Sequence, residues 1–526
     1  MAGWNYGDVL EAVARAHPSR TALIHGGRRM DWAEFDQRAA RLAAVLEAGG
    51  LRPGDVVAEY MRNGTAYLET FFAASKAALA PMNTNYRYVE DELEQIWTDA
   101  DVKAVVYDAE FRDRVAAVRE RLPGVRVWLE TGAPYEEALA AQEPRPHGGG
   151  RPDSLVLIYT GGTTGRPKGV MWRQDDLLSM LNAQSTRAIP DRAAPEVVAE
   201  HLAGRREIRS LIASPLMHGA GLFYALSALS GAGTVVTVPG ARFSAEALLD
   251  ALAEERVQGL SIVGDAFARP LLDALDAEPR RWDLSALRVI FSSGAIWSGP
   301  VKEGLLRHIP KARLVDGLGS SEASSIGSTV SVPGDVAGTA SFRVSERGAV
   351  LHDDGTLATP GDGRIGRLAV SGWLPVGYLN DPAKSAEVFV EAAGRRWSVP
   401  GDLAVLEADG RIKLLGRGSS CINTGGEKVF AEEVEEAVKT YPGIVDAAVL
   451  GVPDERLGAK VVAFVVTDGR EADAGGLQAH VRARLAGYKV PRRIARVDSL
   501  DRLANGKLDH RLLARRAERL WGTARA

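Results

Sequence analysis

The sequence predicts an α/β protein with a large N-terminal domain of several subdomains and parallel-rich sheets, followed by a small, mobile α+β C-terminal domain. Its 526 residues exceed what one hydrophobic core holds, which predicts about two to four domains or subdomains. In the first part of the chain, short apolar runs alternate with amphipathic helical segments. Strands separated by helices indicate a largely parallel sheet.

The N-terminal segments carry this alternation. A turn at Gly26 and Gly27 separates two short strands, and residues with helical spacing precede and follow this pair. Runs rich in valine and alanine then predict buried strands. The predicted helices cover residues 9–16 and 32–48, and the predicted strands cover residues 21–24, 29–32, 55–60, 102–107 and 155–158.

Composition and charge exclude several classes of protein. The net charge of -4, with 64 basic and 68 acidic residues, gives no electrostatic case for nucleic acid or an acidic membrane as partner. Cys421 is the single cysteine, which excludes an internal disulfide and a cysteine-rich metal site. The N-terminal residues lack the basic start and apolar run of a signal peptide. We therefore expect a cytoplasmic protein.

Residues 211–241 form the one stretch where a membrane span could be suspected, because they contain no Asp, Glu, Lys or Arg. However, Pro215, Pro239, His218 and five glycines interrupt this stretch. Its periodicity indicates a strand, a helix and a second strand in the protein interior. The sequence thus predicts no integral membrane segment.

A glycine- and threonine-rich segment follows the buried strand that ends near Ile158. Residues 160–169 contain four glycines, three threonines and Lys168. Glycines leave backbone N–H groups open to an oligophosphate, threonine hydroxyls donate further hydrogen bonds, and lysine adds a positive charge. The alternative is a surface turn without a ligand. A kinase-type phosphate loop would need Ser or Thr directly after the lysine, where this chain has Gly169.

The segment resembles the signature of the adenylate-forming enzymes, which include acyl- and aryl-CoA synthetases, luciferases and the adenylation domains of peptide synthetases. The resemblance implies an AMP-binding N-terminal domain over residues 1–417, a hinge at residues 418–422 and a small C-terminal domain at residues 423–526. It also implies that this loop binds the phosphates of ATP. The implied phosphate-binding residues are Thr160, Gly161, Gly162, Thr163, Thr164, Gly165 and Lys168.

Further segments continue the resemblance in the same order. Two buried strands end in small residues, and in an open α/β sheet ligands lie beyond the carboxyl ends of strands. Adenine is expected between them, although the family usually has tyrosine where this chain has Leu318. Glu322, with Thr160, is expected to hold Mg²⁺; alternatively Glu322 is a carboxylate favoured at a helix N-terminus. The implied nucleotide-binding residues are Gly294, Ala295, Asp316, Gly317, Leu318, Gly319, Ser321 and Glu322.

The acid is expected to bind beside a strand end at His218, where the family carries an aromatic residue. Without the resemblance, a histidine after an apolar strand would be read as a satisfied core residue. The uncharged helix at residues 222–229 is expected to form the apolar wall. The implied acyl-pocket residues are His218, Gly219, Leu222, Phe223, Gly294 and Gly319.

The C-terminal part of the resemblance supplies the remaining roles. Asp402 suits the ribose hydroxyls, although an aspartate in an ordinary turn is the alternative. Arg417 is expected near ribose and phosphate, and the hinge pivot, Ser420, departs from the aspartate or lysine of many relatives. Gly425 and Gly426 are expected to line the thiol tunnel. Lys507, otherwise a solvated lysine, is implied as the catalytic residue that reaches the carboxylate and the α-phosphate, together with Glu322 and Thr160.

The sequence therefore predicts an AMP-forming acid–thiol ligase that uses ATP, Mg²⁺ and coenzyme A. The uncharged segments around His218 and a resemblance to actinobacterial acyl-CoA synthetases favour a medium- or long-chain fatty acid or a steroid side-chain acid. The expected partners are small molecules, and the expected oligomeric state is a monomer or a homodimer. Two alternatives stay open: an enzyme that loads a carrier-protein phosphopantetheine, and a non-catalytic nucleotide-binding sensor.

Overall fold

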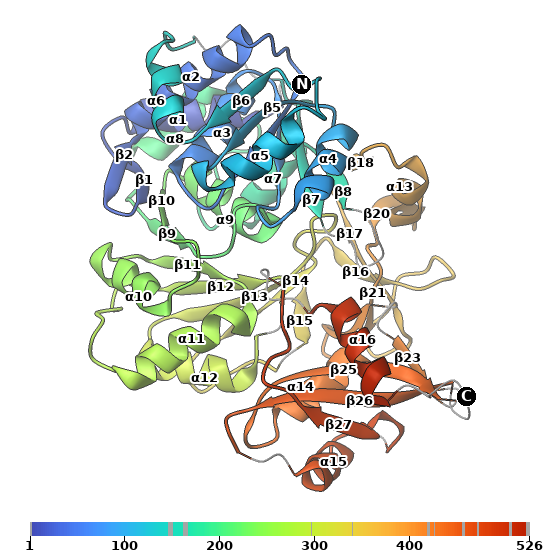
Figure 1. Ribbon diagram of the computed structural model, residues 1–526. Coiled ribbons are helices and arrows are strands. Elements are labelled where there is room, and N and C mark those ends of the chain that lie inside the picture. The colour runs from blue at the N-terminus through green and yellow to red at the C-terminus, as the bar shows by residue number, and fades with distance from the viewer. Residues whose placement is uncertain are drawn as a thin grey trace.

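A computed structural model describes residues 3–145, 151–160, 167–295, 297–338, 340–417, 421–424, 427–454, 458–470, 473–485, 487–503 and 508–521. Three β-sheets organise these residues (Figure 1). Two large sheets with their helices make up the part before Arg417, and a five-stranded sheet makes up the small C-terminal part. The predicted α/β class with a separate small C-terminal domain is confirmed.

The largest sheet has fifteen strands and is mixed. Strands β1, β10, β9, β11, β12 and β13 run parallel to their neighbours in this group, and antiparallel strands extend the sheet on either side. In sheet order, the strands are β19 (Phe389–Ala392), β20 (Arg395–Ser398), β17 (Gly366–Ser371), β21 (Asp402–Leu406), β22 (Arg411–Arg417), β15 (Ser341–Val344), β14 (Gly327–Ser331), β13 (Arg313–Leu318), β12 (Val289–Ser293), β11 (Gly259–Ile262), β9 (Arg209–Ile212), β10 (Thr234–Thr237), β1 (Thr21–His25) and β2 (Arg28–Asp31), while β16 (Gly348–Leu351) pairs with β17.

The second sheet has seven strands and carries the segment on either side of the predicted phosphate loop. Its inner strands are parallel, and β7 and β8 form an antiparallel pair. In sheet order, the strands are β18 (Gly377–Tyr378), β8 (Lys168–Arg173), β7 (Leu155–Thr160), β4 (Ala80–Asn83), β3 (Val56–Tyr60), β5 (Val102–Tyr107) and β6 (Val127–Glu130).

The third sheet belongs to the C-terminal part. The chain leaves the fifteen-stranded sheet at Arg417 and enters this five-stranded sheet at Cys421. Its strands are β24 (Glu427–Phe430), β23 (Cys421–Thr424), β26 (Gly458–Thr467), β25 (Ile444–Asp454) and β27 (Arg493–Arg496).

Helices cover the sheets on both faces, and several of them, α1 and α2 among them, begin at an N-cap residue whose side chain accepts a backbone hydrogen bond. The side chain of Asn5 accepts from Gly7 N, and that of Asp31 accepts from Glu34 N. The helices are α1 (Tyr6–Ala16), α2 (Trp32–Ala48), α3 (Thr65–Lys76), α4 (Glu90–Asp99), α5 (Arg112–Arg119), α6 (Ala133–Ala140), α7 (Gln174–Gln184), α8 (Pro195–Ala203), α9 (Gly219–Ser230), α10 (Ala245–Glu254), α11 (Gly264–Ala277), α12 (Gly299–His308), α13 (Pro382–Val388), α14 (Ala431–Lys439), α15 (Ala474–Arg482) and α16 (His510–Trp521), with short 3₁₀ turns η1 (Ala109–Phe111) and η3 (Gly487–Lys489).

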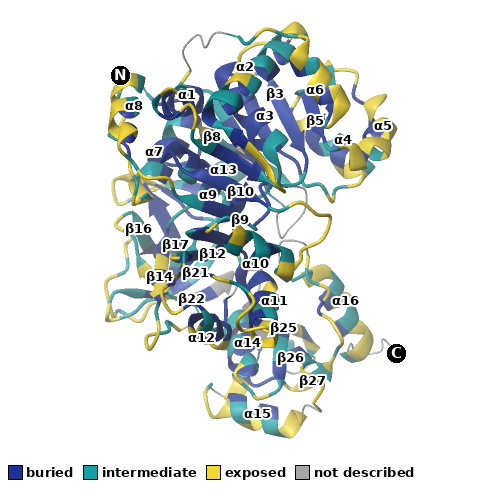
Figure 2. Cartoon of the chain, turned by 90° about the vertical axis from the view of Figure 1, so that its left-hand side faces the viewer, coloured by how far each residue is buried: buried dark blue, intermediate teal, exposed yellow. Residues whose placement is uncertain are grey.

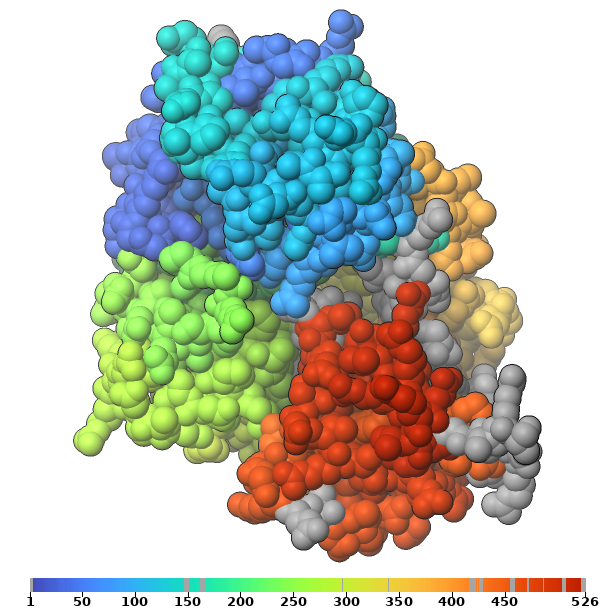
Figure 3. All heavy atoms as spheres, in the orientation of Figure 1, coloured from blue at the N-terminus to red at the C-terminus, as the bar shows by residue number. Residues whose placement is uncertain are grey.

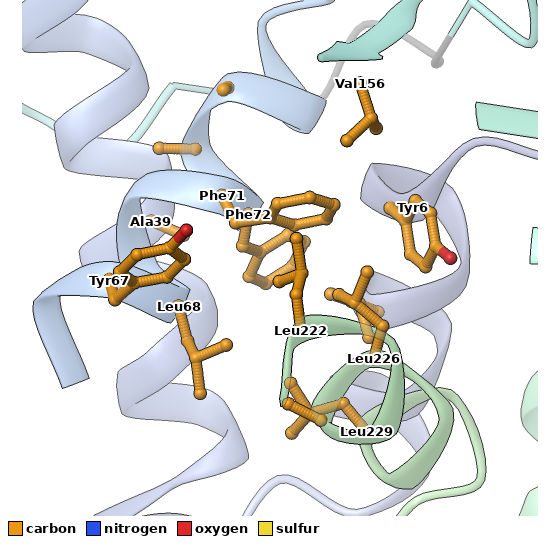
Figure 4. Close-up of a cluster of buried hydrophobic side chains, with 14 of the residues drawn as sticks. Tyr6, Ala39, Tyr67, Leu68, Phe71, Phe72, Val156, Leu222, Leu226 and Leu229 are labelled. Carbon is orange, nitrogen blue, oxygen red and sulfur yellow. The ribbon is translucent and has the colours of Figure 1, made fainter. Parts of the chain in front are cut away.

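The hydrophobic core lies in layers between the sheets and their helices. Figure 2 shows buried residues along the strands, whereas exposed residues lie on outer helices such as α5 and α8. The central helix α9 inserts Leu222, Leu226 and Leu229 into a cluster that also contains Phe71 and Phe72 of α3 (Figure 4). These side chains are at most 2% exposed, so α9 is held firmly by its apolar face.

The structure agrees with most of the predicted N-terminal elements. The helix at residues 32–48 has the predicted bounds, and the first helix begins three residues earlier than predicted, at Tyr6. The uncharged stretch at residues 211–241 forms β9, α9 and β10, as its interrupted periodicity predicted. Among the described residues, the helices are all too short or too polar for a membrane crossing.

A buried ion pair joins α12 to strand β13 beside the strand ends. Lys302 Nζ lies 3.2 Å from the Asp316 carboxylate, and the two side chains are 0% and 9% exposed. Burial raises the pKa of Asp316 from 3.8 to about 6, and the nearby Lys302 ammonium only partly offsets this. Because the folded pKa exceeds the unfolded one, Asp316 favours folding most below pH 4, and this contribution falls as the pH rises through 6.

We predict that Lys302→Met lowers the free energy of unfolding by about 3–5 kcal/mol at pH 7, because it leaves the Asp316 carboxylate buried without a cation. The loss shrinks at pH 5, where Asp316 takes up a proton. Urea unfolding at the two pH values measures both effects. Lys384→Met, which removes an exposed ion pair with Glu387, is the control and costs less than about 1 kcal/mol. Equal losses for the two variants would contradict the prediction.

Candidate active site

A cavity of about 2240 Å³ opens where the N-terminal part, the α10–α12 segment and the C-terminal part meet. The surface is hollowed at this junction (Figure 3). The carboxyl ends of β7, β12 and β13, the start of α9 and residues of α14 and α16 line the cavity. Ligands of open α/β sheets bind beyond the carboxyl ends of strands, so the cavity lies where a nucleotide site is expected.

The strands around the predicted phosphate loop place Thr160 and Lys168 opposite each other. Thr160 ends β7, Lys168 begins β8, and the two residues pair in the antiparallel register. Lys168 Nζ donates to the carboxylate of Asp381 and lies 5.6 Å from the centroid of the Tyr378 ring. The Lys168 ammonium holds the pKa of Asp381 below its usual value. A positive charge thus lies at the end of the loop, already paired with one carboxylate.

Glu322 lies at the cavity wall and is oriented by a tyrosine. The Tyr378 hydroxyl donates to Glu322 Oε1 over 2.9 Å, and Trp172 Nε1 donates to the neighbouring Ser321 carbonyl over 3.0 Å. The described residues contain no cluster of three His, Cys, Asp or Glu side chains that would hold a metal by itself. A single carboxylate fits Mg²⁺, which takes one or two carboxylates together with phosphate oxygens and water.

Small residues open the space between the ends of β12 and β13. Ser293 pairs with Gly317, which brings Gly294 and Ala295 beside Leu318 and Gly319. Gly294 has φ +87° and has open space where a Cβ would stand, whereas a Cβ at Gly319 would lie 3.0 Å from Ala323 O. A flat base can approach the backbone here. Asp316 also borders the cavity, but its carboxylate is directed to Lys302.

Asp402 and Arg417 lie on neighbouring strands. They are partners in the antiparallel register of β21 and β22, and Asp402 lines the cavity. The Arg417 side chain lies outside what the structure describes. The backbone therefore brings the two residues together, and the predicted ribose role of both stays a prediction.

The wall of the predicted acyl pocket is the start of α9. His218 is the N-cap residue, and Gly219 and Phe223 follow along the cavity side. The Phe223 ring meets Trp172 edge to face, with 6.4 Å between ring centroids. Leu222 corrects the sequence expectation: it is 1% exposed and packs into the core with Phe71 and Phe72, away from the cavity (Figure 4). Successive residues of an α-helix point about 100° apart, so Leu222 turns into the core while Phe223 reaches the cavity.

Several predicted site residues lie outside the described part of the chain. These are Gly161, Gly162, Thr163, Thr164, Gly165, Gly425, Gly426 and Lys507, as well as Ser420 of the predicted hinge. On either side of Lys507, Leu503 and Leu508 line the cavity. The roles expected for this group stay predictions.

Sequence reasoning missed three polar residues that contact the predicted site residues. Tyr378 binds Glu322, Asp381 binds Lys168, and Asn83 binds backbone atoms of Tyr159 next to Thr160. Tyr378 lies on the two-residue strand β18, and Asp381 is the N-cap residue of α13. Asn83 follows a short apolar run, and no spacing rule marks it.

Comparisons with known proteins match the whole chain. Residues 10–376 match the AMP-binding enzyme family, and residues 433–507 match the AMP-binding enzyme C-terminal domain. The 3-oxocholest-4-en-26-oate–CoA ligase of Rhodococcus rhodochrous is 37% identical over 527 residues, which cover 96% of this chain and 95% of that protein. The medium-chain acyl-CoA ligase Mig of Mycobacterium avium is 38% identical over 533 residues, which cover 96% of both chains.

Solved structures agree with this result. The ATP-bound MatB structure from Rhodopseudomonas palustris has a TM-score of 0.81 and 26% identity, and the match covers 98% of this chain and 100% of that one. The anthranilate CoA ligase AuaEII, with anthranoyl-AMP, has a TM-score of 0.84 at 22% identity, covers 98% of both chains and supports the fold alone. The resemblance predicted from the loop at residues 160–169 is confirmed, and the chain belongs to the AMP-binding enzyme family.

Proposed function

We propose that this protein is an ATP-dependent acyl-CoA synthetase that activates a hydrophobic carboxylic acid. The acid and ATP form an acyl-adenylate and pyrophosphate, and coenzyme A then gives the acyl-CoA and AMP. The observation that carries the proposal is a single cavity bordered by Thr160, Glu322, the Gly294 turn, Asp402 and the start of α9. The CoA ligase relatives, aligned over nearly the whole chain, support the same reaction.

In the first half-reaction, the substrate carboxylate attacks the α-phosphorus of ATP, a P–O bond to the acid forms, and pyrophosphate leaves. Two anions must approach each other, so the protein contributes positioning and positive charge. The Thr160 hydroxyl, Lys168 and Lys507 would bind phosphate oxygens, and the carboxylate of Glu322, held by Tyr378, would face the metal. Mg²⁺, when bound, neutralises charge on the pyrophosphate oxygens.

In the second half-reaction, the thiol of coenzyme A attacks the acyl carbon, the C–O bond to phosphate breaks, and AMP leaves. We expect Lys507 to leave the reacting atoms before the thiol enters, through rotation of the small domain at the predicted hinge. Gly425 and Gly426 would then allow the pantetheine arm to approach closely.

The lack of charged side chains at the start of α9 supports a hydrophobic acid as the substrate. Gly219, Ala220 and Phe223 of α9 face the ends of β12 and β13 across the cavity, and none of them carries a charge. Relatives named for medium- and long-chain fatty acids and for 3-oxocholest-4-en-26-oate favour the same class. We propose a medium- or long-chain fatty acid or a steroid side-chain acid as substrate.

A carrier protein is the alternative thiol donor, and a sensor without catalysis is the alternative outside enzymes. The curated relatives are named as CoA ligases, which favours free coenzyme A. Glu322 lines the cavity and is oriented by Tyr378, and Lys168 is held by Asp381 at the start of β8, which supports catalysis over simple nucleotide binding.

The test is release of pyrophosphate and AMP from ATP with coenzyme A across a panel of acids, from acetate through long-chain fatty acids to steroid side-chain acids. We expect turnover with one hydrophobic class and formation of its acyl-CoA. Pyrophosphate release without acyl-CoA would favour a carrier protein as acceptor. If no acid of the panel supports pyrophosphate release, the non-catalytic nucleotide-binding sensor is favoured.

We predict that Lys507→Ala lowers the rate of adenylate formation by at least about 100-fold, because it removes a cation from the charge that develops at the α-phosphate. Thioester formation from supplied acyl-adenylate stays within about threefold of the unmodified protein, because this step does not use Lys507. Rapid-quench measurements of each half-reaction give both rates. Equal losses in the two steps would contradict the assignment.

We also predict that Tyr378→Phe raises the KM for MgATP by about 3- to 15-fold, because the Glu322 carboxylate loses the hydroxyl that orients it. Glu322→Gln has a larger effect on adenylate formation, since it removes the charge itself. The two changes together cost little more than Glu322→Gln alone, because Tyr378 acts through Glu322. Additive losses would show that Tyr378 acts independently of Glu322.

A further inference from the structure

One buried asparagine connects the two halves of the cavity. Asn83 ends β4 and is 3% exposed. Its Oδ1 accepts from Tyr159 N over 2.6 Å, and its Nδ2 donates to Tyr159 O over 3.0 Å and to Met217 O over 2.5 Å. One side chain thus holds the residue before Thr160 and the residue before His218.

The Asn83 side chain extends the pairing of β4 with β7 through its hydrogen bonds to Tyr159. Strands β4 and β7 pair in parallel through Met82 and Leu157, two residues before Tyr159. A side-chain amide offers both a donor and an acceptor, as a peptide group does. The Asn83 amide therefore binds the N–H and the C=O of Tyr159 and keeps the end of β7 in place.

The contact with Met217 transfers the same constraint to α9. The carbonyl of Met217 directly precedes His218, the N-cap residue of that helix. The apolar face of α9 packs in the core, so the helix has little freedom to follow a displaced strand. The Asn83 amide thereby relates the phosphate end of the cavity to the acyl wall.

A second asparagine offers a matched comparison. Asn63 Nδ2 donates to the carbonyls of Ile212 and Ser214 over 3.1 and 3.0 Å, and its Oδ1 accepts from Leu216 N over 2.7 Å. Like Asn83, Asn63 binds three backbone atoms, but within the described contacts all three lie in the segment before α9 and none in β7.

We propose that Asn83 is a positioning residue that sets the relative placement of the bound nucleotide and the bound acid. The inference rests on the proposed function. In-line attack needs the carboxylate and the α-phosphorus in a narrow range of positions, and a displacement of about 1 Å can cost about 100-fold in rate. Loss of Asn83 therefore separates the two reacting groups while each half of the site still binds its own ligand.

The test compares Asn83→Ala, Asn83→Asp and Asn63→Ala in pyrophosphate release with ATP and dodecanoate or the best acid of the panel. We expect Asn83→Ala to lower kcat about 100-fold, with both KM values and the affinity for ATP alone within about threefold. Asn83→Asp keeps the side-chain size and the acceptor for Tyr159 N but loses donors, and we expect at least a tenfold lower kcat. Asn63→Ala instead raises the KM for the acid, with kcat within about threefold.

Thermal unfolding and ATP binding verify that each variant is folded, and Asn83→Asp is the variant to use if Asn83→Ala is not. An unchanged kcat in a folded Asn83 variant would overturn the inference alone. A rise in both KM values at constant kcat, or the same pattern for Asn83→Ala and Asn63→Ala, would also overturn it. Absence of acid-dependent pyrophosphate release from the unmodified protein would overturn the proposed function, and this inference with it.

Discussion

The arrangement of the cavity depends on the two-sided packing of α9. Its leucines at positions 222, 226 and 229 insert among Phe71 and Phe72, and full burial of such side chains contributes about 1.5–3 kcal/mol each. On the other side of α9, Gly219, Ala220, Phe223, Tyr224 and Ser227 line the cavity. Because the apolar side is fixed, the cavity side of α9 is a rigid surface, and the hydrogen bonds of Asn63 and Asn83 hold the segment that leads into this helix.

Near the predicted phosphate loop, by contrast, charged side chains are held by polar partners. Lys168 is one-third exposed and paired with Asp381, and Glu322 is held by Tyr378. An ion pair this exposed stabilises the fold by at most about 1 kcal/mol. Its effect is on position: a lysine side chain has high rotamer entropy, and a nearby carboxylate keeps its ammonium close to the loop before a nucleotide arrives. A triphosphate carries more negative charge than Asp381 and can compete for Lys168.

The sequence predicted features formed by residues that are neighbours along the chain, but not contacts between residues far apart in the chain. The Gly/Thr-rich loop predicted the family because it forms a continuous pattern, whereas the nucleotide roles of Gly294 and Gly319 stay predictions. Leu222 was assigned to the pocket since α9 is apolar on both sides, and periodicity gives the two sides without saying which one faces the cavity. Asn83 and Asp381 act on residues that are 76 and 213 positions away, so only the folded sheet reveals them.

The C-terminal part has the packing expected of a unit that moves against the rest. Its own core is closed, with Val434, Val449, Val461 and Leu477 each at most 2% exposed. The side it turns to the cavity mixes charged residues such as Glu432, Lys439 and Arg502 with apolar ones such as Leu450 and Leu503. Arg502 is anchored within the same part by Asp446, through bonds of 2.7 and 2.8 Å. A part with its own closed core can change orientation as one unit, and its charged side chains become hydrated where the surfaces separate. A fully hydrophobic interface would hold the C-terminal part in one orientation, whereas adenylation and thioester formation require two orientations.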